Sequence, residues 1–306
     1  MPSTSHHPVF DLAHWRKVLP QEVFEKTLDF RRFDTTPRNS PLDLWKIHGE
    51  IITSPAHLCA TEYARKALAS KRDLGQTVPV DLFVWRTGPP ERPYLTKLGG
   101  IPHRERDTPW PKDRAGAPMT FLAQFCFADS REIVSGKLGG DVLLMFWSDV
   151  DSWCGDPEDI HFEWSNLELR TPARSVDCPA PRFLFPELAG LRHRTFEYPE
   201  AQDAFEAEGH YMAYLLATTQ STKIGRETHF IQNDPRSGDT ELLCALSSIH
   251  PDETWPFANM EALPKGHNQK PVHYGWGRYE MMFGDVGCLY VLIDAQGRLS
   301  WAADCY

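Results

Sequence analysis

A set of four sequence blocks that occurs twice, in the same order, most constrains the fold of this chain. Each copy contains an apolar segment, a Thr-Lys-aliphatic-Gly block, a second apolar segment and a Gly-Asp block. The blocks are residues 80–85, 96–99, 121–125 and 140–145 in the first copy, and residues 211–216, 222–225, 242–246 and 284–289 in the second. Because blocks repeated in a fixed order indicate repeated structural units, we predict an internal duplication.

The order of helix and strand signals along the sequence predicts the fold class. Capping and proline signals at Ser40-Pro41 and Ser54-Pro55, with apolar residues at helical spacing, predict helices in the first 75 or so residues. After Pro79, segments rich in β-branched and aromatic residues alternate with proline and glycine turns. Strands that follow one another without intervening helices favour antiparallel pairing. We therefore expect an internally duplicated α+β fold of mostly antiparallel sheets with an N-terminal helical segment.

The same signals divide the chain into parts. Residues 1–78 are expected to be a helical extension packed on a main domain of residues 79–306. Within the main domain, residues 79–165 and 210–306 form the two predicted repeats. The stretch 166–209 is rich in proline and charge, and we expect it to connect them.

Charge and composition narrow the function classes. The net charge of −10 argues against nucleic-acid binding and suits a basic partner protein, or simply a soluble acidic surface. The longest apolar runs, residues 142–147 and 288–293, have six residues each, far short of the roughly 20 that a membrane span needs. Seven cysteines without any Cys-x-x-Cys pair, and no apolar leader segment at the start, predict a reduced, cytoplasmic protein.

Several blocks resemble the YwqG-like family, a bacterial family of domains of unknown function. The matching blocks are residues 97–102 (KLGGIP), 108–111 (TPWP), 116–124 (GAPMTFLAQ), 223–225 (KIG), 230–232 (FIQ), 284–287 (GDVG) and 305–306 (CY). The resemblance covers roughly residues 80–306 and implies a duplicated α+β fold with no agreed activity. Some members lie in toxin-rich gene neighbourhoods, which implies a protective or partner-binding role. The chain departs from the family at Arg226, where a second glycine is usual, and in its N-terminal extension.

Five residues are candidates for a binding site. Lys97 and Lys223 occupy matched positions, so they could face one cleft and hold an anion, or each could only cover apolar surface at a strand end. Trp110 stands between two prolines, which suits either recognition or a plug beneath a loop. Gln124 and Asp285 lie at apolar strands, where each needs a hydrogen-bond partner from the backbone or from a ligand.

Other chemical templates are weaker. The carboxylates of residues 149–159 fail the spacing of a helix-loop-helix calcium site and fit a solvated hairpin tip better. His267 and His273 share a loop but lack helical metal-ligand spacing, and the sequence holds no nucleophile elbow, P-loop or dinucleotide motif. We therefore expect no metal and no cofactor.

Three functions stay open at this point. The leading hypothesis is a non-catalytic binding protein that neutralises a partner such as a toxin, in the manner of an immunity protein. The alternative is a small-molecule or anion-binding enzyme with a site between the two repeats. A purely structural accessory domain is the third.

Overall fold

The computed structural model of the chain describes residues 75–148, 159–181, 187–200, 222–228, 230–248, 283 and 287–305. Its strands are β1 (Val78–Thr87), β2 (Lys97–Leu98), β3 (Thr120–Cys126), β4 (Val142–Trp147), β5 (Ile160–Ser165), β6 (Leu188–Glu197), β7 (Lys223–Ile224), β8 (Glu241–Ser247), β9 (Cys288–Ile293) and β10 (Leu299–Asp304). Two three-residue 3-10 turns, η3 (Arg131–Ile133) and η6 (Ser175–Asp177), lie between them. No helix in these residues is long and apolar enough to cross a membrane.

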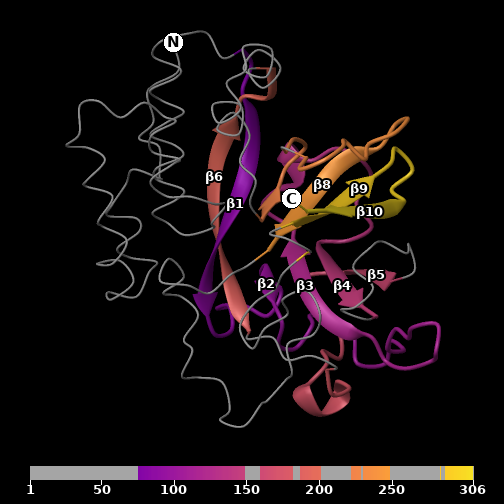
Figure 1. The fold of residues 1–306 in the computed structure, drawn as a ribbon. Helices are drawn as coiled ribbons and strands as arrows, with labels where there is room; N and C mark the ends of the chain where they lie inside the picture. Colours follow the sequence, from indigo (N-terminus) through magenta and orange to yellow (C-terminus); the bar gives the residue numbers. More distant parts are fainter. Residues whose placement is uncertain are drawn as a thin grey trace.

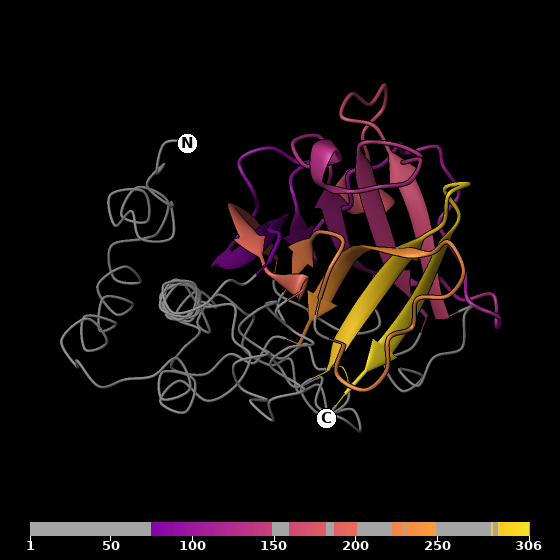
Figure 2. The same ribbon diagram turned by 90° about the horizontal axis from the view of Figure 1, so that it is seen from above.

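The ten strands form one antiparallel sheet that curls into a nearly closed barrel (Figures 1 and 2). Its order is β10-β9-β8-β7-β1-β6-β2-β3-β4-β5. The expected α+β class is therefore wrong, because the described residues carry no helix longer than the two short 3-10 turns. The α+β expectation rested on helix-start signals in the first 75 residues. The predicted extension, residues 1–78, lies outside the described residues except for its last four.

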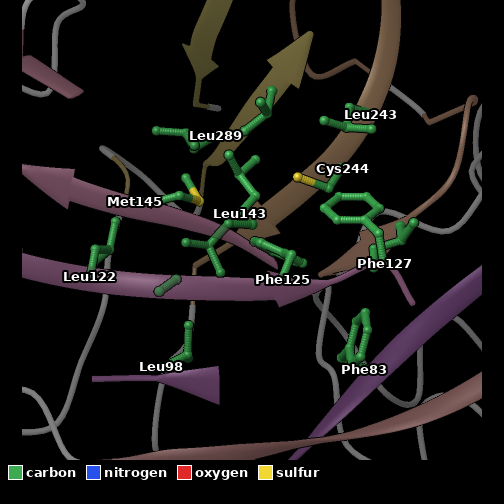
Figure 3. Packing of buried hydrophobic residues seen from close by; sticks show 14 of the residues in the cluster. Phe83, Leu98, Leu122, Phe125, Phe127, Leu143, Met145, Leu243, Cys244 and Leu289 are labelled. Carbon is green, nitrogen blue, oxygen red and sulfur yellow. The ribbon is translucent and has the colours of Figure 1, made fainter. Parts of the chain in front are cut away.

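Buried apolar residues explain why the central strands form. β4 and β9 are buried at all six of their positions, since their side chains fill the barrel on one face and a smaller outer cluster on the other. Figure 3 shows Leu143 and Met145 of β4 facing Leu289 of β9 and Leu243 of β8 across the barrel interior. Strands buried on both faces read as continuous apolar runs rather than alternating ones.

The sheet order has an internal symmetry. β2, β3, β4 and β5 pair in succession on one side, and β7, β8, β9 and β10 pair in the same succession on the other. The register of the β3–β4 pair shifts between Phe121 and Ala123, and that of β8–β9 shifts at the matching place, between Leu242 and Cys244. A bulge at the same point of two equivalent strand pairs is a specific feature, and it gives the correspondence between the halves residue by residue.

The first strand of each half is exchanged. β1 pairs with β7 of the second half, and β6 pairs with β2 of the first, while β1 and β6 pair with each other along ten residues. The hydrogen bond from Phe83 N to Thr222 O (3.0 Å) has its counterpart in the bond from Gly190 N to Thr96 O (2.9 Å). β6 is therefore the structural equivalent of β1. It lies inside the stretch 166–209, which the sequence predicted to be a connector.

The correspondence also revises the match between the Gly-Asp blocks. Beyond the bulge, Val142 pairs with Cys126 in the first half, and Cys288 pairs with Ser247 in the second half. Val142 and Cys288 are thus equivalent, whereas the sequence aligned Val142 with Val286. The sequence match is two residues out of register, which preserves the alternation of side chains in a strand and so leaves no sign in the hydrophobic pattern.

Candidate functional site

The Thr-Lys blocks have the same backbone role in both halves. The Thr96 hydroxyl accepts a hydrogen bond from Cys126 N (3.0 Å), and the Thr222 hydroxyl accepts one from Ser247 N (3.2 Å). Each threonine directly precedes a strand of only two residues, and its hydroxyl satisfies a backbone N–H group at the end of the longer neighbouring strand. These contacts give the threonine of the repeated block a structural explanation.

The two lysines form separate ion pairs. Lys97 Nζ lies 2.9 Å from Glu187 Oε1, near the start of β6. Lys223 Nζ lies 2.9 and 3.0 Å from the carboxylate oxygens of Glu197, at the end of β6, and both side chains are almost fully buried. Ten residues of extended chain place the carboxylates roughly 30 Å apart. The lysines therefore do not converge on one cleft, and the anion-binding alternative loses its main support.

Gln124 holds a loop in place through all of its polar atoms. Its Oε1 accepts a hydrogen bond from His103 N (3.0 Å), and its Nε2 donates to Pro93 O (2.7 Å) and Leu95 O (2.8 Å). The side chain is fully buried. The backbone partners expected for Gln124 are therefore present, and they tie the residues before and after β2 to β3.

Trp110 covers a buried cation. Its indole packs edge-on against Phe146 with ring centroids 5.2 Å apart, and its Nε1 donates to Met119 O (2.7 Å). The Arg104 guanidinium lies 5.1 Å from the centre of the Trp110 ring. Of the two roles considered for Trp110, these contacts correspond to the plug beneath a loop.

The side chain of Arg104 joins its own loop to the barrel. The side chain of Arg104 is 2% exposed, and its Nε and Nη2 donate to both carboxylate oxygens of Glu163 on β5 (3.1 and 2.8 Å). Its other bonds go to the carbonyls of Thr108 and Pro109 (3.1 and 3.0 Å). Such a two-pronged, buried ion pair fixes geometry more strictly than an exposed one does.

The loops at residues 99–119 and 166–181 make one continuous structure, which we call the ridge. Their backbones bond directly, from Arg106 N to Thr171 O (2.7 Å) and from Ala173 N to Arg104 O (2.9 Å). The Glu105 carboxylate accepts three further bonds, from Arg170 N and from the N and Oγ1 of Thr171, and the backbone bonds hold its pKa below the usual range. The ridge is thus braced along its length by its own polar groups.

The imidazole of His103 is enclosed in the ridge. Its Nε2 lies 3.0 Å from Asn166 O and 3.1 Å from Leu167 O, and its ring meets the edge of Tyr94 at 5.9 Å. Since both neighbours of Nε2 are acceptors, that nitrogen carries the hydrogen. Burial lowers the pKa of His103, against the opposing effect of the two carbonyls.

The tip of the ridge presents an apolar side chain. Val176 is 81% exposed, on the 3-10 turn η6. The turn is closed by Asp177, whose carboxylate accepts bonds from the backbone and guanidinium of Arg174 and lies 3.3 Å from Arg106. The segment that carries η6, crimson in Figure 1, projects away from the strands. Val176 is thus an apolar side chain held outward on a fixed turn.

The polar residues under the ridge have no counterpart in the second half. Gln124, Leu144 and Glu163 face one another along one rung of β3, β4 and β5. The equivalent rung of β8, β9 and β10 is Ala245, Tyr290 and Ala302. The strand framework therefore forms without the buried glutamine and the half-buried glutamate, so these groups serve the ridge rather than the sheet.

The second half closes its outer face differently. Phe230 packs edge-on against Tyr290 at 4.9 Å, and Ile231 N donates to the Tyr290 hydroxyl (3.2 Å). Arg236 lies over the Phe230 ring at 5.1 Å, with Glu227 and Asp234 as its ion partners. An arginine over an aromatic ring is common to both halves, whereas the buried polar rung is specific to the first.

A further polar cluster secures η3. Asp81 of β1 is fully buried and accepts hydrogen bonds from the Ser130 hydroxyl (2.6 Å) and from two nitrogens of Arg194 on β6. Arg194 also contacts Glu132 (2.5 Å), and Arg192 donates to Asp129 O (2.8 Å). These pairs explain how β6 accommodates arginines. The oxygen atoms that accept from the two arginines belong to Asp81, Asp129 and Glu132.

Two sequence candidates fall outside the described residues. Asp285 lies there, and so does most of the acidic loop 149–159, although β4 and β5 form the antiparallel hairpin expected around that loop. In the part of the chain that the structure describes, no three His, Cys, Asp or Glu residues gather in a group able to hold a metal ion.

The sequence missed the residues that shape the ridge, namely His103, Arg104, Glu105 and Glu163. Glu163 carried a weak signal, since it lies between Phe162 and Trp164 in a strand of alternating pattern. The others are polar residues in a loop, and nothing in their spacing distinguishes a buried ion pair from a solvated charge.

Comparison with known proteins places the chain in a family. No curated protein sequence matches it. The family model described as a domain of unknown function (DUF1963) matches residues 96–297, about two thirds of the chain. The described barrel extends beyond that match by β1 at one end and β10 at the other, and β1 supplies the strand between β6 and β7. The chain belongs to the family of the domain of unknown function DUF1963.

Proposed function

We propose that this protein is a non-catalytic binding protein that contacts a partner protein through the ridge. The observation that carries the proposal is the rung of Gln124 and Glu163 beneath the ridge, which the second half replaces with Ala245 and Ala302. Buried polar groups are costly unless they are satisfied, and when satisfied they specify one conformation. The second half forms its strands without such polar side chains, so the presence of Gln124 and Glu163 in the first half supports selection for the shape of the ridge.

The chemistry of the ridge favours contact over catalysis. Arg104 donates to Glu163 and to backbone carbonyls, and the Nε2 of His103 faces two backbone carbonyls. His103 and Arg104 thus face inward and hold the loops. The exposed apolar side chain at the tip is Val176, beside the exposed Arg174 and Ser175. A preordered apolar group of this kind binds at low entropic cost.

The partner follows from charge and family resemblance. The net charge of −10 favours long-range attraction to a basic protein. Within DUF1963 we assign the chain to the YwqG-like group, and we propose that neutralisation of a partner such as a toxin is its role, as in an immunity protein. We also propose that it works in the cytoplasm, where its described cysteines, all free, would stay reduced. A stable contact of this type buries about 1,600 Å² in total.

The test is a quantitative co-purification with the products of neighbouring genes. Val176→Lys places at the exposed tip a positive charge that repels a basic partner, and it is compared with Ser300→Lys, which adds the same charge at an exposed position of β10. We expect the wild type and Ser300→Lys to recover the same partner, and Val176→Lys to lose it with an unchanged melting temperature. Equal recovery by all three proteins would exclude the ridge tip as the contact.

A further inference from the structure

His103 joins the two loops of the ridge. Its backbone N–H is held by Gln124 of β3, while its Nε2 reaches the carbonyls of Asn166 and Leu167 in the other loop. The ring itself is nearly buried. One side chain therefore spans the seam between the loops.

The surroundings of the His103 ring are already charged. The titratable or charged groups that face it or adjoin it are Tyr94, Lys97, Arg104, Glu105 and Glu163. Each of the two buried cations has its own carboxylate, since Lys97 pairs with Glu187 and Arg104 pairs with Glu163. A protonated His103 would be a third cation in the same place. The carboxylate of Glu105 favours the charged ring, but it is already held by the backbone N–H groups of residues 170 and 171.

We propose that His103 is a pH-sensitive latch that keeps the two loops of the ridge together when neutral and releases them when protonated. The neutral ring donates to the two carbonyls without adding charge. The protonated ring brings an additional positive charge beside Lys97 and Arg104 in a site of low water content. Opening of the seam lets water reach that charge, which favours the open ridge under acid conditions.

The direction of the effect follows from linkage. Burial lowers the pKa of His103, so the folded ridge binds fewer protons than the open one. The stabilisation is complete above the ordinary histidine pKa of about 6.5 and is lost as the pH falls below it. Control of partner binding by this latch rests on the proposed function of the ridge, whereas the latch itself concerns the chain alone.

The experiment is hydrogen exchange on the full chain at about pH 5 and about pH 7.5, on either side of the ordinary histidine pKa, after correction for the intrinsic rate. Peptides that cover residues 99–110 and 166–173 report on the seam, and peptides from β3 and β4 serve as internal controls. We expect the seam to lose protection at the lower pH by about tenfold for each unit by which the folded pKa lies below 6.5. The control strands should keep their protection.

His103→Gln supplies the matched variant, because its side-chain amide can donate to the same carbonyls but cannot be protonated in this range. We expect its seam protection to be equal at the two pH values. An equal loss in His103→Gln, or no loss in the wild type, would overturn the proposal. If the variant does not fold, an NMR titration of the His103 ring in the wild type decides, since the ring and the Leu167 amide must then titrate together.

The outcome of the hydrogen-exchange experiment is independent of partner recovery by Val176→Lys. A seam that opens at low pH while the partner remains bound would contradict the ridge as the binding surface and leave the latch intact. A seam that does not respond to pH would overturn the latch and leave the binding proposal to its own test.

Discussion

Replacement of Gln124 by alanine removes a side chain that ties the ridge to β3. The substitution leaves one N–H group, that of His103, and two carbonyls, those of Pro93 and Leu95, without their bonds to the fully buried Gln124 side chain. Each lost bond costs about 1 kcal/mol, so the free energy of unfolding should fall by about 3 kcal/mol. For a domain of this size the melting temperature should fall by about 6–12 °C.

The assay is urea unfolding of Gln124→Ala beside Gln232→Ala, with hydrogen exchange on the folded state. Gln232 is an exposed glutamine with one bond, from its Nε2 to Cys305 O (2.7 Å), and its loss should cost no more than about 1 kcal/mol. Because Ala245 occupies the equivalent place in the second half, the barrel itself should persist in Gln124→Ala, with the fastest exchange in the ridge. An equal loss in the free energy of unfolding for the two variants would contradict the role assigned to Gln124.

Three further substitutions test other parts of the structure. Arg104→Lys loses the two-pronged bond to Glu163 and should cost about 2–3 kcal/mol in urea unfolding; a cost close to zero would contradict the assigned role. Lys223→Met leaves the buried Glu197 carboxylate without its cation and should cost about 3–5 kcal/mol, most of which a simultaneous Glu197→Leu should restore. The Arg131 guanidinium holds the pKa of Asp141 below its usual range, so the stability from Asp141 is present above about pH 4 and lost as the pH falls further. Asp141→Asn should accordingly flatten the fall in melting temperature below about pH 4, and an unchanged slope would disprove the linkage.

The sequence was a good guide to the strands that are mostly apolar. β4 and β9 are the two longest apolar runs, residues 142–147 and 288–293, and β3 and β8 contain the apolar segments 121–125 and 242–246, because burial on both faces leaves little room for polar residues. The turn between β9 and β10 has residues typical of a turn, Asp294-Ala295-Gln296-Gly297, and Asp294 accepts bonds from Gln296 N and Arg298 N (2.9 Å each). Local chemistry of this kind is visible in the residues themselves.

β6 could not be recognised in the same way. Its Gly190, Arg192, Arg194 and Glu197 are typical of a solvated segment, and their acceptance in a central strand depends on partners far along the chain. Arg194 pairs with Asp81, 113 residues earlier, and Glu197 pairs with Lys223. Long-range pairing of charges is a property of the folded structure and leaves no periodic trace in one sequence.

The candidate site shows the same limit. Gln124 was found because a glutamine inside an apolar strand requires a partner, and that requirement is a local argument. Lys97 and Lys223 were matched correctly as a repeated pair, yet a repeated lysine does not say where its carboxylate lies. The exchange of β1 and β6 between the halves separates the two ion pairs along β6, and strand exchange cannot be inferred from block order.

We propose the ridge of the first half as the surface that contacts a partner. Hydrogen exchange of the wild-type chain, alone and with the co-purified partner, measures this directly. We expect slower exchange over residues 99–110 and 166–178 in the complex, with little change in the equivalent second-half loop at residues 230–240. Protection confined to that second loop, or absent from residues 166–178, would contradict it.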